Sequence, residues 1–110
     1  MIYNIKQTAG NVILVNYTIP IDTPTYLGVF TGPGNETKTA IIPNSECGDV
    51  YELTITGIAE SYEDLTIGEI YFASLGTWSV VLYYQASITN LDPSLATLLE
   101  TFNLQINGCT

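Results

Sequence analysis

Alternation of apolar and polar side chains with a period of two runs through most of the chain, and it limits the fold more than any other feature. The pattern is clearest in Val50–Thr56, where large apolar residues occupy every second position. Because successive side chains of a strand point to opposite faces, this segment is predicted to bury one face and to expose the other. Similar patterns predict further strands at residues 12–19, 26–31, 38–42, 68–73, 77–85 and 99–107.

Turn-forming residues separate these segments. Gly32–Asn35 contains two glycines and a proline, and Ser74–Gly76 is predicted to join 68–73 and 77–85 in a hairpin. A single helical turn is expected at Pro93–Leu98. The pattern is typical of an all-β fold, a small immunoglobulin-like or jelly-roll-like β-sandwich of seven or eight short antiparallel strands. With 110 residues, the chain is long enough for one such domain, residues 1–110.

The charge balance is strongly acidic, because eleven Asp and Glu residues face only Lys6 and Lys38 and give a net charge of −9. Two lysines cannot neutralise a row of phosphates, so nucleic-acid binding is not expected, and an anionic membrane surface is disfavoured for the same reason. No apolar run is long enough to cross a membrane, and Met1–Lys6 does not resemble a signal peptide. We therefore expect synthesis in a cytoplasm.

Reactive groups are scarce. The chain has no histidine, which removes the commonest general base and metal ligand. Glu60, Glu63 and Asp64 lie close together in a polar segment, where solvated carboxylates are expected rather than a catalytic pair or a calcium site. Cys47 and Cys109 are predicted to be separate thiols rather than a disulfide. We predict no enzymatic activity, no cofactor and no metal site.

The segment 77–85 is apolar on both sides, which is unusual for a strand in a small domain. Trp78, Val80, Leu82 and Tyr84 share one face, whereas Val81, Tyr83 and Gln85 share the other. Such a strand is either covered on both sides or presents its second face to a partner. We favour the second interpretation, with Val81 and Tyr83 facing the partner.

The segments Leu75–Gln85 and Thr89–Ala96 also carry a resemblance. Their Gly-Thr-Trp turn, long strand and Asn-Leu-Asp-Pro loop resemble the C-terminal half of small β-rich structural proteins of tailed phages that infect Bacteroidetes, crAss-like phages among them. The resemblance implies an auxiliary or decoration protein of the virion, bound to the capsid shell, and it implies no catalytic or cofactor residues.

The expected partner is therefore the major capsid protein or another structural protein of the virion. Assembly with further copies of the chain is left open. Two other functions are also left open, a carbohydrate-binding or adhesin module and a component of the tail or neck. The candidate partner-contact residues lie in the two-faced strand and the loop after it: Trp78, Val81, Tyr83, Gln85, Asn90 and Asp92.

Overall fold

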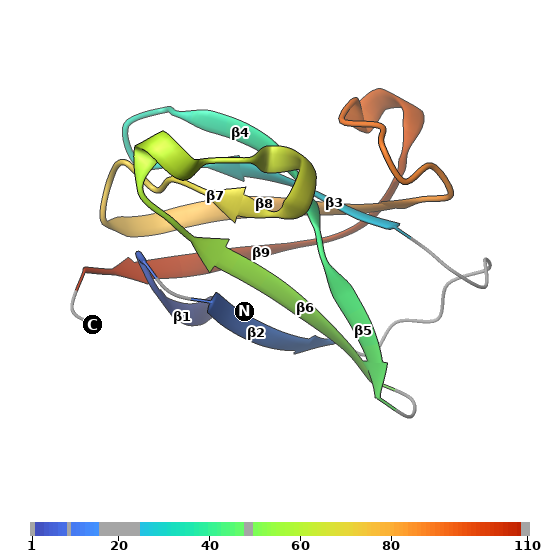
Figure 1. Ribbon diagram of the computed structural model, residues 1–110, viewed down its shortest axis with the longest axis horizontal. Coiled ribbons are helices and arrows are strands. Elements are labelled where there is room, and N and C mark those ends of the chain that lie inside the picture. Colours follow the sequence, from blue (N-terminus) through green and yellow to red (C-terminus); the bar gives the residue numbers. More distant parts are fainter. Residues whose placement is uncertain (1, 9, 16–24, 48–49, 109–110) are drawn as a thin grey trace.

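The computed structural model describes residues 2–8, 10–15, 25–47 and 50–108, which form two β-sheets facing each other (Figure 1). The larger sheet has five strands in the order β1-β9-β8-β3-β4. Their bounds are Ile2–Lys6, Thr97–Asn107, Gly76–Gln85, Thr25–Thr31 and Thr37–Ile42. The smaller sheet has the order β2-β6-β5, and β7 pairs with the end of β6. Its strands are Gly10–Val15, Val50–Gly57, Asn44–Cys47 and Glu69–Ile70.

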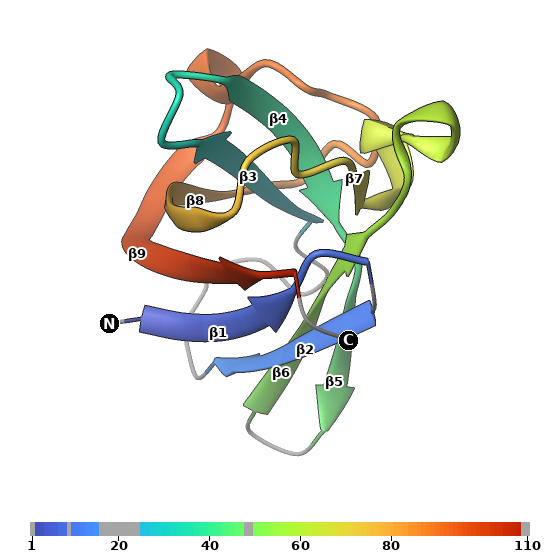
Figure 2. The same ribbon diagram turned by 90° about the vertical axis from the view of Figure 1, so that its left-hand side faces the viewer.

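Strand β8 is the centre of the larger sheet. It pairs in antiparallel fashion with β9 on one side and with β3 on the other. Strand β1 lies on the far side of β9 and runs parallel to it (Figure 2). The expectation that all strands are antiparallel is therefore wrong for two pairs, β1–β9 and β6–β7. Alternation shows which side chains of a strand share a face, but not whether the strand runs parallel or antiparallel to its neighbour.

One nearly continuous strand links the two sheets. β4 ends at Ile42, Pro43 interrupts the ladder, and β5 begins at Asn44 in the smaller sheet. The carbonyl of Pro43 accepts a hydrogen bond of 2.9 Å from the amide of Thr54 in β6. Gly68 lies against this corner with φ of 76°, and a Cβ there would lie 2.4 Å from the Pro43 ring. The corner therefore requires glycine at 68.

The space between the sheets is filled by apolar side chains, with an aromatic cluster at its centre. Phe72 contacts Trp78 and Phe30 edge-to-face, with ring centroids 5.1 and 6.1 Å apart. The indole Nε1 of Trp78 donates a hydrogen bond of 2.9 Å to the carbonyl of Ser74. All three aromatic side chains are completely buried. A second close approach occurs at Gly57, where a Cβ would lie 2.0 Å from the Gln7 carbonyl oxygen.

Most of the strands expected from alternation are present. β3, β4, β6, β8 and β9 confirm the predictions at 26–31, 38–42, 50–56, 77–85 and 99–107. β2 covers residues 10–15, and the rest of the segment predicted at 12–19 lies outside the described residues. The sequence pattern gave no indication of β1 or β5, because neither has regular alternation.

The hairpin predicted around Ser74–Gly76 is wrong. β7 covers only Glu69–Ile70 and belongs to the smaller sheet, whereas β8 belongs to the larger one. Between them, the backbone of Tyr71 bonds to side chains instead of to a strand. Its amide donates to Glu63 Oε2 over 2.8 Å, and its carbonyl accepts from Lys38 Nζ over 2.7 Å. The chain thus crosses between the sheets here, with Phe72 as its anchor in the core.

The connections contain short 3₁₀ turns. The predicted turn at Pro93–Leu98 is present as Pro93–Leu95, where the Asp92 carboxylate accepts from the Ser94 amide over 3.0 Å. Two further turns, Glu60–Tyr62 and Leu65–Ile67, occupy the polar segment at 59–66. Among the described residues there is no helix of the length and apolar character needed to cross a membrane.

Candidate functional site

The outward side of the larger sheet is the first candidate surface. In β8, Trp78, Val80 and Leu82 point into the core, so Val81 and Tyr83 point outward. The register places Val81 beside Val29 of β3 and Tyr83 beside Leu27. Val81, Tyr83 and Val29 are half-buried, whereas Leu27 has no exposed surface, so the part of the outward side around Leu27 is covered. Val81 and Tyr83 thus face away from the core, and their contact with a partner stays a prediction.

Around these three residues the outward side carries uncharged polar side chains from all five strands, and we call this whole surface the outer face. Its polar members are mostly threonine and asparagine. They are Asn4, Thr25, Thr31, Thr37, Thr39, Thr77, Ser79, Thr101, Asn103, Gln105 and Asn107. Among the described strands of this sheet, the only charged residue whose register places it on the outer face is Lys6, at one corner.

Acidic residues of the larger sheet and its neighbouring loops lie elsewhere. Glu100 of β9 pairs with Leu82, whose side chain points to the core. Burial, and after it the charge of Glu100, raises the pKa of Tyr3. Glu60 and Asp64 are exposed in the 59–66 segment, as expected for solvated carboxylates. Glu63 instead forms an ion pair with Lys38, and both side chains are less than a third exposed. Among the described strands of the larger sheet, none thus places an acidic side chain on the outer face; the exposed Asp92 lies at its border, in the loop that folds back over Gln85.

Two of the six candidate contact residues are too deeply buried to contact a partner. Trp78 has no exposed surface, because its side of β8 is the core side, so its assignment to a partner contact is wrong for this fold. Gln85 lies on the outward side of β8 but is only 6% exposed. The loop after β8 turns back over it, so the expected contact through Gln85 is also wrong.

Asn90 and Asp92 lie in that loop and hold it in place. The side-chain nitrogen Nδ2 of Asn90 donates to Gln85 Oε1 over 2.6 Å, and Gln85 Nε2 donates to the backbone carbonyl of Asn90 over 2.8 Å. Asn90 Oδ1 accepts from the Asp92 amide over 3.0 Å. The Ser94 hydroxyl and amide stabilise the charged Asp92 carboxylate and hold its pKa below the usual range. Both residues have a structural role in shaping the loop, and Asp92 is also exposed.

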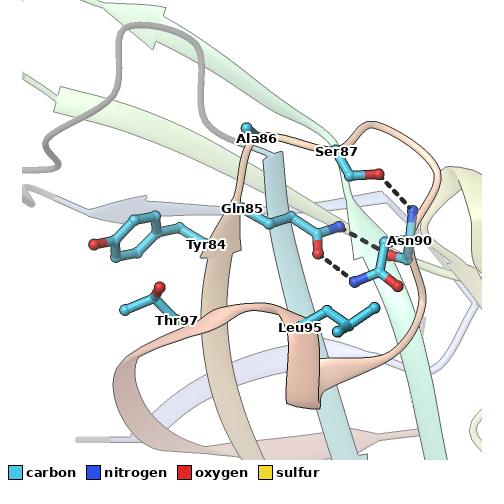
Figure 3. Close-up of a pocket in the computed structure, with 7 residues that line it drawn as sticks. All are labelled: Tyr84, Gln85, Ala86, Ser87, Asn90, Leu95 and Thr97. Carbon is cyan, nitrogen blue, oxygen red and sulfur yellow. Dashed lines mark hydrogen bonds between the residues drawn. The ribbon is translucent and has the colours of Figure 1, made fainter.

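The same loop forms a pocket of about 460 Å³ at the end of β8 (Figure 3). Its polar lining comes from Gln85, Ser87, Asn90 and Thr97, and the rest from Tyr84, Ala86 and Leu95. None of these seven residues is charged. In Figure 3, Tyr84 and Thr97 lie together on one side of the strand, whereas Gln85 and Asn90 form their bonded pair on the other.

A carboxylate in the Gly32–Glu36 loop is shielded from water near the core. The oxygens of Glu36 are inaccessible, and its side chain lies against Gly32 and Gly34. The Ser74 hydroxyl, followed by the backbone amides of Glu36 and Gly34, lowers the pKa of Glu36. The carboxylate therefore stays charged where it packs.

Several of these residues were missed by sequence reasoning. Thr31, Thr37 and Ser79 belong to different strands, and only the register shows that they share one face. Leu95 and Tyr84 become pocket residues because the loop folds back, which no local pattern specifies. Residues 25–31 and 76–85 contain no Asp or Glu, and this absence is the sequence feature that indicates a surface without acidic side chains.

No group of three or more Cys, Asp or Glu residues is arranged to bind a metal ion within the part of the chain that the structure describes. Cys109 lies outside the described residues, so the prediction of separate thiols stays a prediction. No protein-family model matches the chain, and no curated protein matches it significantly.

Proposed function

We propose that this chain is a non-catalytic binding domain that attaches through its outer face to another protein, and that this protein belongs to a phage virion shell. The observation that carries the proposal is the segregation of charge. The chain has a net charge of −9, yet none of the described strands of its largest sheet places an acidic side chain on the outward side. Interface centres are depleted of charged residues and enriched in tyrosine, as this surface is around Tyr83.

The outer face suits contact with a folded surface. It is built on hydrogen-bonded strands, so little backbone order has to be gained on binding. Neutral hydroxyl and amide groups cost less to desolvate than carboxylates do, and Val29, Val81 and Tyr83 supply apolar area. Five strands about 4.8 Å apart and about 20 Å long give at most roughly 500 Å², because the loop after β8 covers Gln85 and the neighbouring Leu27 has no exposed surface. This area is at the small end of specific interfaces, so one buried charge near its centre should matter.

The virion assignment rests on the resemblance of residues 75–96 and is supported by the charge. A strongly acidic domain is repelled by packaged DNA and is better placed outside a shell. The major capsid protein is the expected partner, and a position in the tail or neck is the variant of this proposal that localisation would reveal. Synthesis is expected in the host cytoplasm, followed by incorporation into the particle.

The test combines detection with a matched pair of variants. Mass spectrometry of purified full and empty particles should find the chain, and its absence from both would refute the virion assignment. Ser79→Glu introduces a charge into the outer face, whereas Ser61→Glu introduces the same charge at an exposed position in the Glu60–Tyr62 turn. We expect Ser79→Glu to weaken co-sedimentation with particles by about tenfold or more, and Ser61→Glu to leave it unchanged. Equal effects of the two variants would contradict docking through the outer face.

A further inference from the structure

Strand β1 lies at one edge of the larger sheet (Figure 2), and its hydrogen bonds show which backbone groups point away from the sheet. The amide of Gln7, directly after β1, donates to a carbonyl of β9 over 2.9 Å. Lys6 points the other way, because its amide and carbonyl bond to the side chain of Asn11 over 3.1 and 3.2 Å. Backbone groups alternate in direction along a strand, so those of Ile2 and Asn4 also point away from β9.

This edge of the sheet is open. The outward amides and carbonyls of Ile2 and Asn4 have no hydrogen-bond partner among the described residues. Both residues are exposed, and 57% of the Ile2 surface is accessible. The opposite edge is covered, since a Cβ at Gly68 would lie 2.9 Å from the Ile41 carbonyl oxygen of β4. An open edge that carries an exposed isoleucine is a template for another strand.

The charges near this edge favour a second copy of the chain as the added strand. Two molecules with a net charge of −9 repel each other, so they approach most easily where carboxylates are absent. Strand β1 contains no acidic residue and carries Lys6, one of the two lysines of the chain. The single acidic residue of the neighbouring β9 is Glu100, which is half-buried. Identical strands are also self-complementary when they pair about a twofold axis.

We propose that two copies of the chain pair through their β1 edges, antiparallel and about a twofold axis at Tyr3. This register places Ile2 of each copy opposite Asn4 of the other, so the outward amides of each copy meet the outward carbonyls of the other. A register centred on Asn4 would instead need the backbone groups of Lys6, which Asn11 already occupies.

The side chains of β1 fit this register. Tyr3 of one copy lies directly opposite Tyr3 of the other, and aromatic pairs across strands are favourable. Each Tyr3 ring is held in place by Phe102, which it contacts edge-to-face with ring centroids 5.4 Å apart. On the other side of the strand, the exposed Ile2 gains a neighbour in Asn4 of the second copy. The pairing thus covers an apolar side chain that the single copy leaves in water.

A dimer of this kind joins two outer faces into one surface. Asn4 belongs to the outer face, and the twofold axis keeps the outer faces of both copies on the same side of the joined sheet. The dimer therefore offers twice the area for docking. The pairing does not require the partner proposed above, because it concerns the isolated chain. A chain that stays monomeric could still dock through a single outer face, so the two proposals fail separately.

Hydrogen exchange of the isolated ¹⁵N-labelled protein, followed by NMR from micromolar to millimolar concentrations, tests the pairing residue by residue. The amides of Ile2 and Asn4 should exchange about tenfold more slowly, or slower still, once the dimer forms. The amides of Tyr3 and Ile5 point to β9 within one copy, so their exchange should not depend on concentration. Sedimentation should show the same transition from monomer to dimer, and added salt should favour the dimer by screening the net charge. Exchange at Ile2 and Asn4 that is independent of concentration would overturn the proposal.

Two variants of Asn4 locate the interface. Asn4→Pro removes the outward amide and should abolish the dimer, while the β1–β9 ladder remains because this amide takes no part in it. Asn4→Ala is the matched control, since it keeps the amide and should dimerise like the unchanged chain. Fluorescence of the buried Trp78 reports whether each variant is folded. A folded Asn4→Pro variant that still dimerises would overturn the proposal, and if this variant does not fold, the exchange measurement on the unchanged chain decides.

Discussion

Replacement of Phe72 by alanine tests whether the crossing segment between β7 and β8 belongs to the core. Phe72 lies outside any strand, yet it is completely buried between Trp78 and Phe30. Truncation of a buried Phe to Ala removes apolar contacts and leaves a cavity, at a cost of about 3–5 kcal/mol. A domain of this size has a total stability of about 5–15 kcal/mol, so the variant should be close to unfolding.

Urea denaturation followed by fluorescence measures this cost directly, because Trp78 is the only tryptophan and has no exposed surface. With a slope of about 1–3 kcal/mol per molar urea, the midpoint should fall by about 1 M or more. Because the substitution also changes the surroundings of Trp78, the urea midpoint should be measured by circular dichroism as well. The two methods should give the same midpoint. The matched control is Leu75→Ala in the same segment, where the side chain is 53% exposed and the expected loss is below about 1 kcal/mol. A loss below about 1 kcal/mol for Phe72→Ala as well would refute this role of Phe72.

Three other predictions concern single contacts. Gly57→Ala should destabilise the fold by more than about 2 kcal/mol because its Cβ would collide with a backbone carbonyl, whereas Gly10→Ala, with nothing within 4 Å, should be tolerated in the same urea assay. Lys38→Met removes the ion pair and a backbone hydrogen bond of the crossing segment and should lower the free energy of unfolding by about 1–3 kcal/mol, whereas Lys6→Met should change it by less than about 0.5 kcal/mol. The pKa of Glu36 is lowered in the folded state, so its contribution to stability is present above its ordinary pKa of 4.5 and is lost as the pH falls through the folded value; unfolding of Glu36→Gln should therefore depend less on pH between about 5 and 2. An unchanged pH dependence in Glu36→Gln would contradict this assignment.

Much of the larger sheet could be predicted from alternation, because β8 and β9 alternate between buried and more exposed residues, although β3 has three consecutive buried residues. The direction of pairing could not be predicted, since it depends on contacts between β1 and β9 at opposite ends of the chain. Alternation predicts a strand at 68–73 because Ile70 and Phe72 are apolar and two residues apart. The backbone partners of the crossing segment are the side chains of Lys38 and Glu63, which no local pattern identifies.

The candidate sites were only partly predictable for a related reason. Alternation shows that Trp78 and Val81 point to opposite faces, but where both faces are apolar it does not say which one is the core. In the structure the core side is that of Trp78, which has no exposed surface and packs against Phe72. The irregularity in the pairing of β8 with β9 between Leu82 and Tyr83 also lies beyond sequence patterns.

The parallel pairing of β1 with β9 has a consequence for the order of folding. Ile2 pairs with Asn103 and Lys6 with Asn107, so nearly the whole described chain must be synthesised before β1 can find its partner. Closing so long a loop is slow, and contacts of this kind are typical of proteins that fold in milliseconds to seconds. Between the synthesis of β9 and its pairing with β1, the exposed edge of β9 can pair with other strands. During synthesis on a ribosome, β1 therefore stays unpaired until β9, its neighbour in the sheet, has been made. Errors in assembly should concentrate at this edge of the sheet.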